Sequence, residues 1–129
     1  MARASKLADW YQSHEAIGRE ATIRAQLDII KILTGDYVEK IKRTTAYDPA
    51  QGLGLRGVAV EWARIGWGLK WSEERVDLGY RFIFGLQELG ILQIVDDPKL
   101  PNATGNLFKK LILNQDALPN ADTRIKTQP

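Results

Sequence analysis

The chain has 129 residues, no cysteine and a net charge of +2 at neutral pH, and 44% of its residues are hydrophobic. This length is typical of one domain, and the apolar share is sufficient for a hydrophobic core. The lack of cysteine excludes disulfides, thiol nucleophiles and cysteine-based metal sites. No apolar run approaches the ~18 residues of a membrane span, and the first residues do not resemble a secretory signal. We therefore expect a soluble, cytoplasmic protein without membrane contact.

Charge is unevenly distributed along the chain. Residues 1–39 carry a net charge of −1 and residues 40–71 a net charge of +4, followed by −4 over residues 72–98 and +3 over residues 99–129. Two basic segments thus flank one acidic segment. Any nucleic-acid contact is expected in the basic segments, because attraction to phosphates depends on local positive charge.

Residues 1–43 are predicted to form an N-terminal helical region. Apolar residues recur at helical spacing throughout it. The triplet "TGD" (34–36) predicts a break, with Gly35 ending one helix and Asp36 capping the next. Basic residues then gather at the end of the last helix, where attraction to the helix dipole explains them without a ligand; they are Lys40, Lys42 and Arg43.

Residues 44–56 are predicted to be a connector leading into the next element. The stretch "GLGLRG" (52–57) matches the dinucleotide-binding fingerprint G-x-G-x-x-G. That fingerprint requires a buried strand immediately before it, inside a βαβ unit. The preceding "TTAYDPAQ" (44–51) is no such strand. We therefore interpret the three glycines as parts of a flexible connection and expect no cofactor.

Residues 57–71, "GVAVEWARIGWGLKW", fit two structures. As a helix they place Val58, Trp62 and Ile65 on one core stripe. As two strands they alternate apolar residues with small or polar ones. We favour a helix to about Gly66 followed by a tight turn, with the strands as the alternative.

The following segment predicts a helix with both ends marked. Ser72 is suited to the N-cap, Glu73 and Glu74 to the first turn, and Gly90 to the position just past the last turn. Beyond this helix, residues 91–95 predict a strand, 96–106 a loop and 107–113 a return strand. Residues 114–129 contain few apolar residues and are expected to form a flexible tail.

Residues 57–113 resemble the winged helix-turn-helix family. "FIFGLQELGIL" (82–92) is similar to the end of that family's third helix, where Leu-x-x-Leu-Gly-(Leu/Ile) leads straight into the wing, and "ILQIVDDPKLPNATGNLFKKLIL" (91–113) is similar to the wing hairpin. The resemblance implies a mainly α fold with a small β-hairpin, here with an N-terminal helical extension. It also implies a third helix in the DNA major groove and a wing on the backbone or minor groove.

Carried onto this chain, the groove face of the third helix would consist of Glu73, Glu74, Asp77, Arg81 and Glu88. Four carboxylates and one arginine would then face a polyanion, whereas basic contacts normally dominate DNA affinity. In this respect the sequence departs from the DNA-binding members of the family.

Basic side chains are the candidate contacts to phosphate. The predicted nucleic-acid-binding residues are Arg56, Arg64, Lys70, Arg81, Lys99, Lys109 and Lys110. The alternative for the lysines near the hairpin is a solvated surface that discourages edge pairing.

Aromatic and apolar residues are predicted to form a second surface. The stripes between residues 57 and 71 exceed what one core covers, so we expect Val60, Trp67, Trp71 and Phe84 at a protein interface or a homodimer contact. The alternatives are stacking on single-stranded bases and burial under the N-terminal helices.

Catalytic chemistry has little support in the sequence. His14 is the single histidine and lies on an amphipathic helix, where a structural role is expected. Asp96 and Asp97 form a carboxylate pair without the further ligands that a metal site needs. We expect no enzyme and no metal.

Together these patterns predict a small, non-enzymatic winged-helix protein that binds DNA, duplex rather than single-stranded. It would dock through the wing and the basic 40–70 region, as a regulator of transcription or an accessory factor for replication or a mobile element. A homodimer through the N-terminal helices or the tryptophan surface is expected. The alternative is a winged-helix adaptor whose acidic third helix and exposed aromatics bind another protein.

Overall fold

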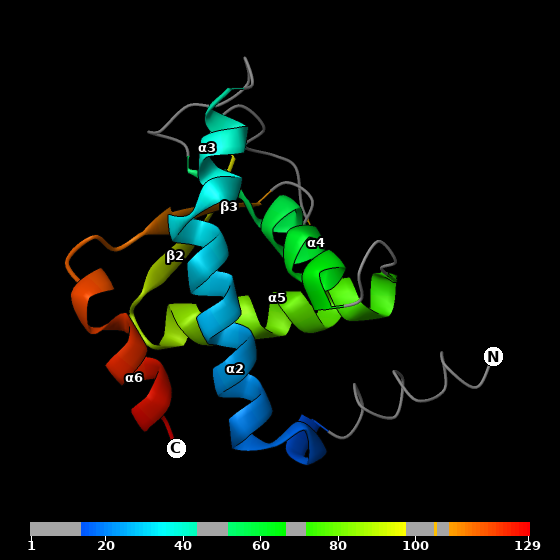
Figure 1. Ribbon diagram of the computed structural model, residues 1–129, viewed down its shortest axis with the longest axis vertical. Coiled ribbons are helices and arrows are strands. Elements are labelled where there is room, and N and C mark those ends of the chain that lie inside the picture. The colour runs from blue at the N-terminus through cyan, green and yellow to red at the C-terminus, as the bar shows by residue number, and fades with distance from the viewer. Residues whose placement is uncertain (1–13, 44–51, 67–71, 98–104, 106–108) are drawn as a thin grey trace.

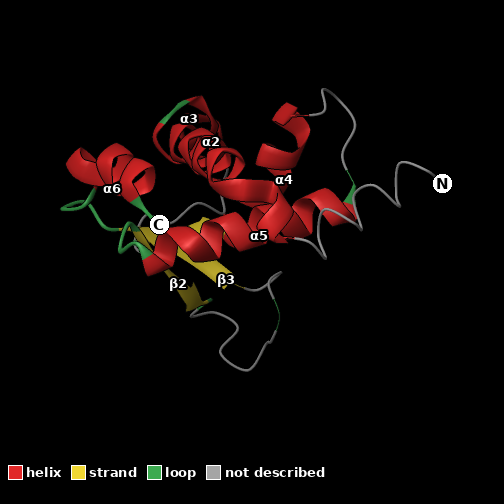
Figure 2. Cartoon of the chain, turned by 90° about the horizontal axis from the view of Figure 1, so that it is seen from below, coloured by secondary structure: helices red, strands yellow, loops and turns green. Residues whose placement is uncertain are grey.

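Helices make up most of the described chain and lie to one side of a small antiparallel sheet (Figures 1 and 2). The structure, a computed structural model, describes residues 14–43, 52–66, 72–97, 105 and 109–129. The prediction of a mainly helical protein with a small β-hairpin is confirmed at this level. Predictions for residues 1–13, for Trp67 to Trp71 and for the loop around Lys99 lie outside the described residues.

The N-terminal region contains α2 (His14–Thr34) and α3 (Asp36–Lys42). The predicted break is confirmed at Gly35, where a Cβ atom would lie 2.6 Å from the carbonyl oxygen of Lys31. Gly35 itself is the N-cap, in extended conformation, and Asp36 is already the first helical residue. The prediction of Asp36 as the cap is wrong, because the second helix restarts after a single residue. A further interruption at Gly18, with φ of 74°, divides α2 near its start.

The predicted connector contains a strand that the sequence did not reveal. β1 (Leu53–Gly54) pairs with β3, and α4 (Leu55–Gly66) follows without a gap. A strand of two residues is too short to show the alternation of apolar and polar residues. Gly52 has φ of 78°, and a Cβ there would lie 2.0 Å from the carbonyl oxygen of Leu111. Glycine is therefore required at 52 for the close approach of the two backbones.

The helices α4 and α5 (Glu73–Glu88) begin and end close to the predicted positions. The helical alternative for the stretch from residue 57 is confirmed up to Gly66. Val58 and Trp62 are buried as expected, but the placement of Ile65 on the core stripe is wrong, since its side chain lies near the end of the helix and is 58% exposed. The Ser72 hydroxyl accepts a hydrogen bond of 3.3 Å from the backbone N–H of Arg75, which confirms the predicted N-cap. Gly90, with φ of 76°, follows the last turn as expected.

The contact between α4 and α5 forms the centre of the core. Trp62 of α4 packs edge-on against Phe82 of α5, with ring centroids 5.4 Å apart. Gly79 lets the helices approach, since a Cβ there would lie 3.1 Å from the Trp62 ring and 3.3 Å from the Ala59 methyl. On the other side of α5, a Cβ on Gly85 would lie 2.6 Å from the buried Gln26 amide of α2. Two glycines thus set how closely α5 meets its neighbours.

The sheet has the strand order β1–β3–β2, with β2 (Leu92–Asp96) and β3 (Lys109–Leu113) paired antiparallel. Side chains alternate between its faces. The buried face carries Leu53, Leu92 and Leu111, which belong to the core. Lys110 and Ile112 lie on the opposite face, and Ile112 is 39% exposed. Lys110 pairs with Gly54, so the hairpin meets the start of α4 at this point.

The C-terminal residues fold, in contrast to the flexible tail expected for 114–129. They form the 3-10 turn η2 (Leu118–Asn120) and α6 (Ala121–Thr127). Ala117, Ala121 and Ile125 are buried, four residues apart on one helical face. Arg19 of α2 donates a hydrogen bond of 2.9 Å from Nε to the Gln128 carbonyl oxygen. The prediction of a tail is therefore wrong, because three small or medium apolar residues at helical spacing suffice when α2 covers them.

Candidate nucleic-acid interface

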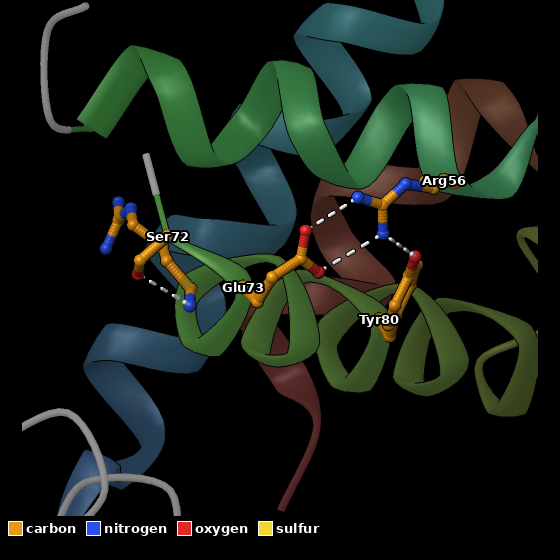
Figure 3. Close-up of polar contacts among 5 residues, drawn as sticks. Arg56, Ser72, Glu73 and Tyr80 are labelled. Carbon is orange, nitrogen blue, oxygen red and sulfur yellow. Dashed lines mark hydrogen bonds and ion pairs between the residues drawn. The ribbon is translucent and has the colours of Figure 1, made fainter. Parts of the chain in front are cut away.

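Arg56 joins the starts of α4 and α5 (Figure 3). Its Nη2 donates to Glu73 Oε1 at 2.7 Å, and its Nη1 donates to Glu73 Oε2 and to the Tyr80 hydroxyl, both at 3.3 Å. These hydrogen bonds raise the pKa of Arg56 and lower that of Glu73. Arg56 was predicted to bind phosphate, and here its fork is held by a carboxylate of the same chain.

Arg75 is a second arginine that serves the packing of these helices. Its guanidinium lies 4.3 Å from the centroid of the Trp62 ring, and its Nε donates to the Ala63 carbonyl oxygen at 3.1 Å. Burial lowers the pKa of Arg75 to about 10. A cation over an indole face that also binds a helix C-terminal carbonyl stabilises the α4–α5 contact.

The outer face of α5 is acidic with an aromatic residue in the middle. Phe84 is 37% exposed and shares this face with Asp77, Arg81 and Glu88, at positions −7, −3 and +4 along the helix. Glu73 and Glu74 extend the acidic face at the N-terminal end. Burial, followed by repulsion from these two carboxylates, raises the pKa of Asp77. The acidic character predicted for this face is therefore present on an exposed helix surface.

An open hollow of about 480 Å³ lies between α3 and the first three turns of α4. Val60, Tyr37 and Ile41 supply its partly buried apolar side chains. Its charged residues are Lys40 from α3 and Arg56, Glu61 and Arg64 from α4. Burial and the nearby Glu61 raise the pKa of Tyr37, so its hydroxyl stays protonated in this lining. Cations from two helices thus converge on one concave surface.

The base of the hairpin adjoins this hollow. Gly54 lines the hollow and pairs with Lys110 of β3. The neighbouring Lys109 forms an ion pair with Asp96 across the two strands of the hairpin. We call Lys40, Arg56, Arg64 and Lys110 the basic edge.

The structure brings some predicted site residues together and separates others. Arg56, Arg64 and Lys110 belong to the basic edge, whereas Arg81 lies on the acidic face of α5. Val60 lies in the hollow and packs partly against the core. The remaining predicted residues, Lys70, Lys99, Trp67 and Trp71, lie outside the described residues.

Lys40 is the member of the basic edge that was not among the predicted nucleic-acid-binding residues. Its place near the end of a short helix was explained by the helix dipole alone. Its proximity to α4 depends on the direction that α3 takes after Gly35, and no local pattern encodes that arrangement. The positive charge of residues 40–71 was the available signal.

Within the described residues, no group of three or more histidine, aspartate or glutamate side chains is placed to hold a metal ion. No helix among them has the length and apolar character needed to cross a membrane. Comparison with known proteins finds no match among family models, curated proteins or solved structures.

Proposed function

We propose that the chain is a winged-helix protein that binds duplex DNA through its basic edge. The order of α4, α5, β2 and β3 supports the winged-helix assignment: a helix, a short connection, a second helix and then directly a two-stranded hairpin. β1 adds a third strand beside this hairpin, and α2 with α3 forms the N-terminal extension.

The convergence of Lys40 and Arg64 on one hollow, with Lys110 paired to Gly54 at its margin, carries the proposal. Each residue comes from a different element, and together they represent both basic segments of the sequence. Backbone phosphates attract such surfaces without regard to base sequence. Glu61 lies among these cations and Glu73 occupies Arg56, so we expect moderate affinity with a strong dependence on salt.

The docking mode differs from that of a helix that reads the major groove. The outer face of α5 carries four carboxylates, which repel the phosphates that line the groove. Docking through the basic edge brings only the N-terminal end of this face, at Glu73, close to DNA. The protein would therefore bind with little base specificity of its own, since base contacts rather than phosphate contacts carry sequence information.

Fluorescence anisotropy with a labelled random duplex and a single strand at about 50 mM and about 200 mM salt tests the proposal. We expect duplex binding that weakens steeply with salt. The Lys40/Arg64/Lys110→Ala variant should bind more weakly and lower the slope of log affinity against log salt by up to about 3, one for each lost contact. Arg24/Lys126→Ala is the control, because both residues are exposed outside the basic edge. Absence of duplex binding at the lower salt concentration would contradict the proposal.

A second function, protein binding through α5, is favoured by one observation. Phe84 is exposed at the centre of a charged helix face, and isolated aromatic residues in such a position are frequent anchors of protein interfaces. The basic edge and the acidic face are separate surfaces, so one chain can present both.

A further inference from the structure

Two exposed helix surfaces of this protein have opposite charge and the same layout. On α4, Arg56, Val60 and Arg64 follow one another at intervals of four residues, so a row of cation, apolar residue and cation extends along ~12 Å of helix. Arg56 is already paired with Glu73 of the same chain, and Glu61 lies beside this row. On α5, Phe84 lies between Asp77 and Glu88, a row of carboxylate, aromatic residue and carboxylate over ~16 Å that also contains Arg81. Such rows lie on one helix face and are accessible to one partner.

The two surfaces also match in shape. The α4 row lies in the hollow of about 480 Å³, where Tyr37 and Ile41 extend the apolar lining and Lys40 adds a third cation. The α5 row is convex, since it lies on the outer side of a single helix, and Phe84 is 37% exposed at its centre. An aromatic side chain on a convex helix fits an apolar hollow whose rim has the opposite charge.

We propose that the acidic face of α5 docks into the α3–α4 hollow of a second copy of this chain. Phe84 enters the hollow near Val60, and Asp77 and Glu88 meet the cations of its rim. Charge complementarity identifies the occupant: the chain itself carries a surface that fits each side of the contact. Like-charged surfaces would meet if two α5 faces, or two hollows, faced each other directly, which disfavours those two arrangements.

Two copies that exchange both contacts form a closed symmetric dimer. Otherwise each copy uses its α5 for one neighbour and its hollow for another, and assembly extends with concentration unless a larger ring closes. The inference goes beyond the proposed DNA binding and does not depend on it. Where both hold, self-association and DNA compete, because Lys40 and Arg64 serve both contacts.

Sedimentation velocity over a range of protein concentrations, without DNA, tests the inference. We expect the sedimentation coefficient of the full chain to rise with concentration at low salt and to fall to the monomer value at high salt. Phe84→Ser removes the aromatic knob, and Lys40/Arg64→Glu reverses the rim of the hollow. Each variant alone should remain monomeric. Arg24/Lys126→Glu, an equal charge change outside both surfaces, should assemble like the unmodified chain.

Mixing the two defective variants is the decisive step. The Phe84→Ser chain keeps an intact hollow and the Lys40/Arg64→Glu chain keeps an intact α5, so an equimolar mixture should form a heterodimer and nothing larger. A mixture that stays monomeric, or an unmodified chain that is monomeric at every concentration at low salt, overturns the inference. Thermal unfolding of both variants verifies that they fold. The anisotropy titration of the unmodified chain separately decides whether DNA is bound, so failure of one proposal is distinguishable from failure of the other.

Discussion

The outer face of α5 and the hollow between α3 and α4 lie on adjacent helices and differ in almost every physical respect. The α5 face is convex, acidic and formed by one continuous segment. The hollow is concave, predominantly basic and assembled from α3, α4 and Gly54 of β1, which pairs with Lys110. Arg56 and Glu73 join the two at their boundary. The basic residues of the hollow belong to segment 40–71 and the acidic face belongs to segment 72–98, so the fold keeps on different helices charges that the sequence already segregates. Under the proposed function the basic side is the surface for DNA.

Weakening the α4–α5 contact should cause the largest loss of stability, because this contact holds together the two helices that carry the two surfaces. Trp62 is 5% exposed and packs against Phe82 and Arg75. We expect Trp62→Ala to lower the free energy of unfolding by about 3–5 kcal/mol, measured by urea denaturation. Ile65→Ala on the same helix, where the side chain is 58% exposed, should change it by less than ~0.5 kcal/mol. Equal losses would mean that Trp62 does not anchor the contact.

Charge reversal at either end of α5 tests which part of this helix lies near DNA. Glu74 follows Glu73, the partner of Arg56, and we expect Glu74→Lys to raise DNA affinity about tenfold at low salt. Glu88→Lys lies ~21 Å farther along the helix, beyond a Debye length of ~10 Å, and should change affinity less than ~2-fold. Anisotropy titration at equal ionic strength measures both. Equal gains from the two variants would indicate that the whole of α5 approaches DNA.

The ion pair between Arg56 and Glu73 is expected to lower the affinity of the basic edge for DNA. Glu73→Gln removes the negative charge that competes with phosphate for Arg56 and should raise DNA affinity about 3-fold. The cost in stability should stay below ~1 kcal/mol, since Glu73 is exposed. The same titration together with urea denaturation measures both effects. Unchanged affinity would place Arg56 outside the DNA contact.

The smallest expected effect is on the pH dependence of stability, through Asp77 of α5. Burial and neighbouring carboxylates raise the pKa of Asp77, so the folded state binds its proton more tightly than the unfolded state does. Stability therefore falls as pH rises through this raised pKa, and the penalty is fully present at neutral pH. Asp77→Asn should stabilise the fold slightly at neutral pH and have no effect below the ordinary carboxyl pKa. Thermal unfolding across pH measures this, and a gain confined to acidic pH would contradict the assignment.

Local chemistry made the helices α4 and α5 predictable. Ser72 and Gly90 mark the ends of α5 through capping rules that involve only a few neighbouring residues. The acidity of the α5 face also followed from helical periodicity alone. These features depend on residues close together in the sequence.

Features that depend on distant pairing were not predictable. β1 exists because Leu53 pairs with Leu111, and α6 folds because α2 covers Ile125. The hollow required the position of α3 relative to α4. Its residue Lys40 was therefore assigned to the helix dipole, although its charge reaches a surface shared with Arg64.

Site-directed cleavage of DNA tests most directly whether the basic edge, rather than α5, faces DNA. The chain has no cysteine, so Glu61→Cys in the hollow and Phe84→Cys on α5 each provide a single attachment point for an iron–EDTA probe. Both chains would be bound to the same random duplex, and hydroxyl-radical cleavage would be compared. Our account predicts strong cleavage from residue 61 and little from residue 84. Strong cleavage from residue 84 with little from residue 61 would contradict it.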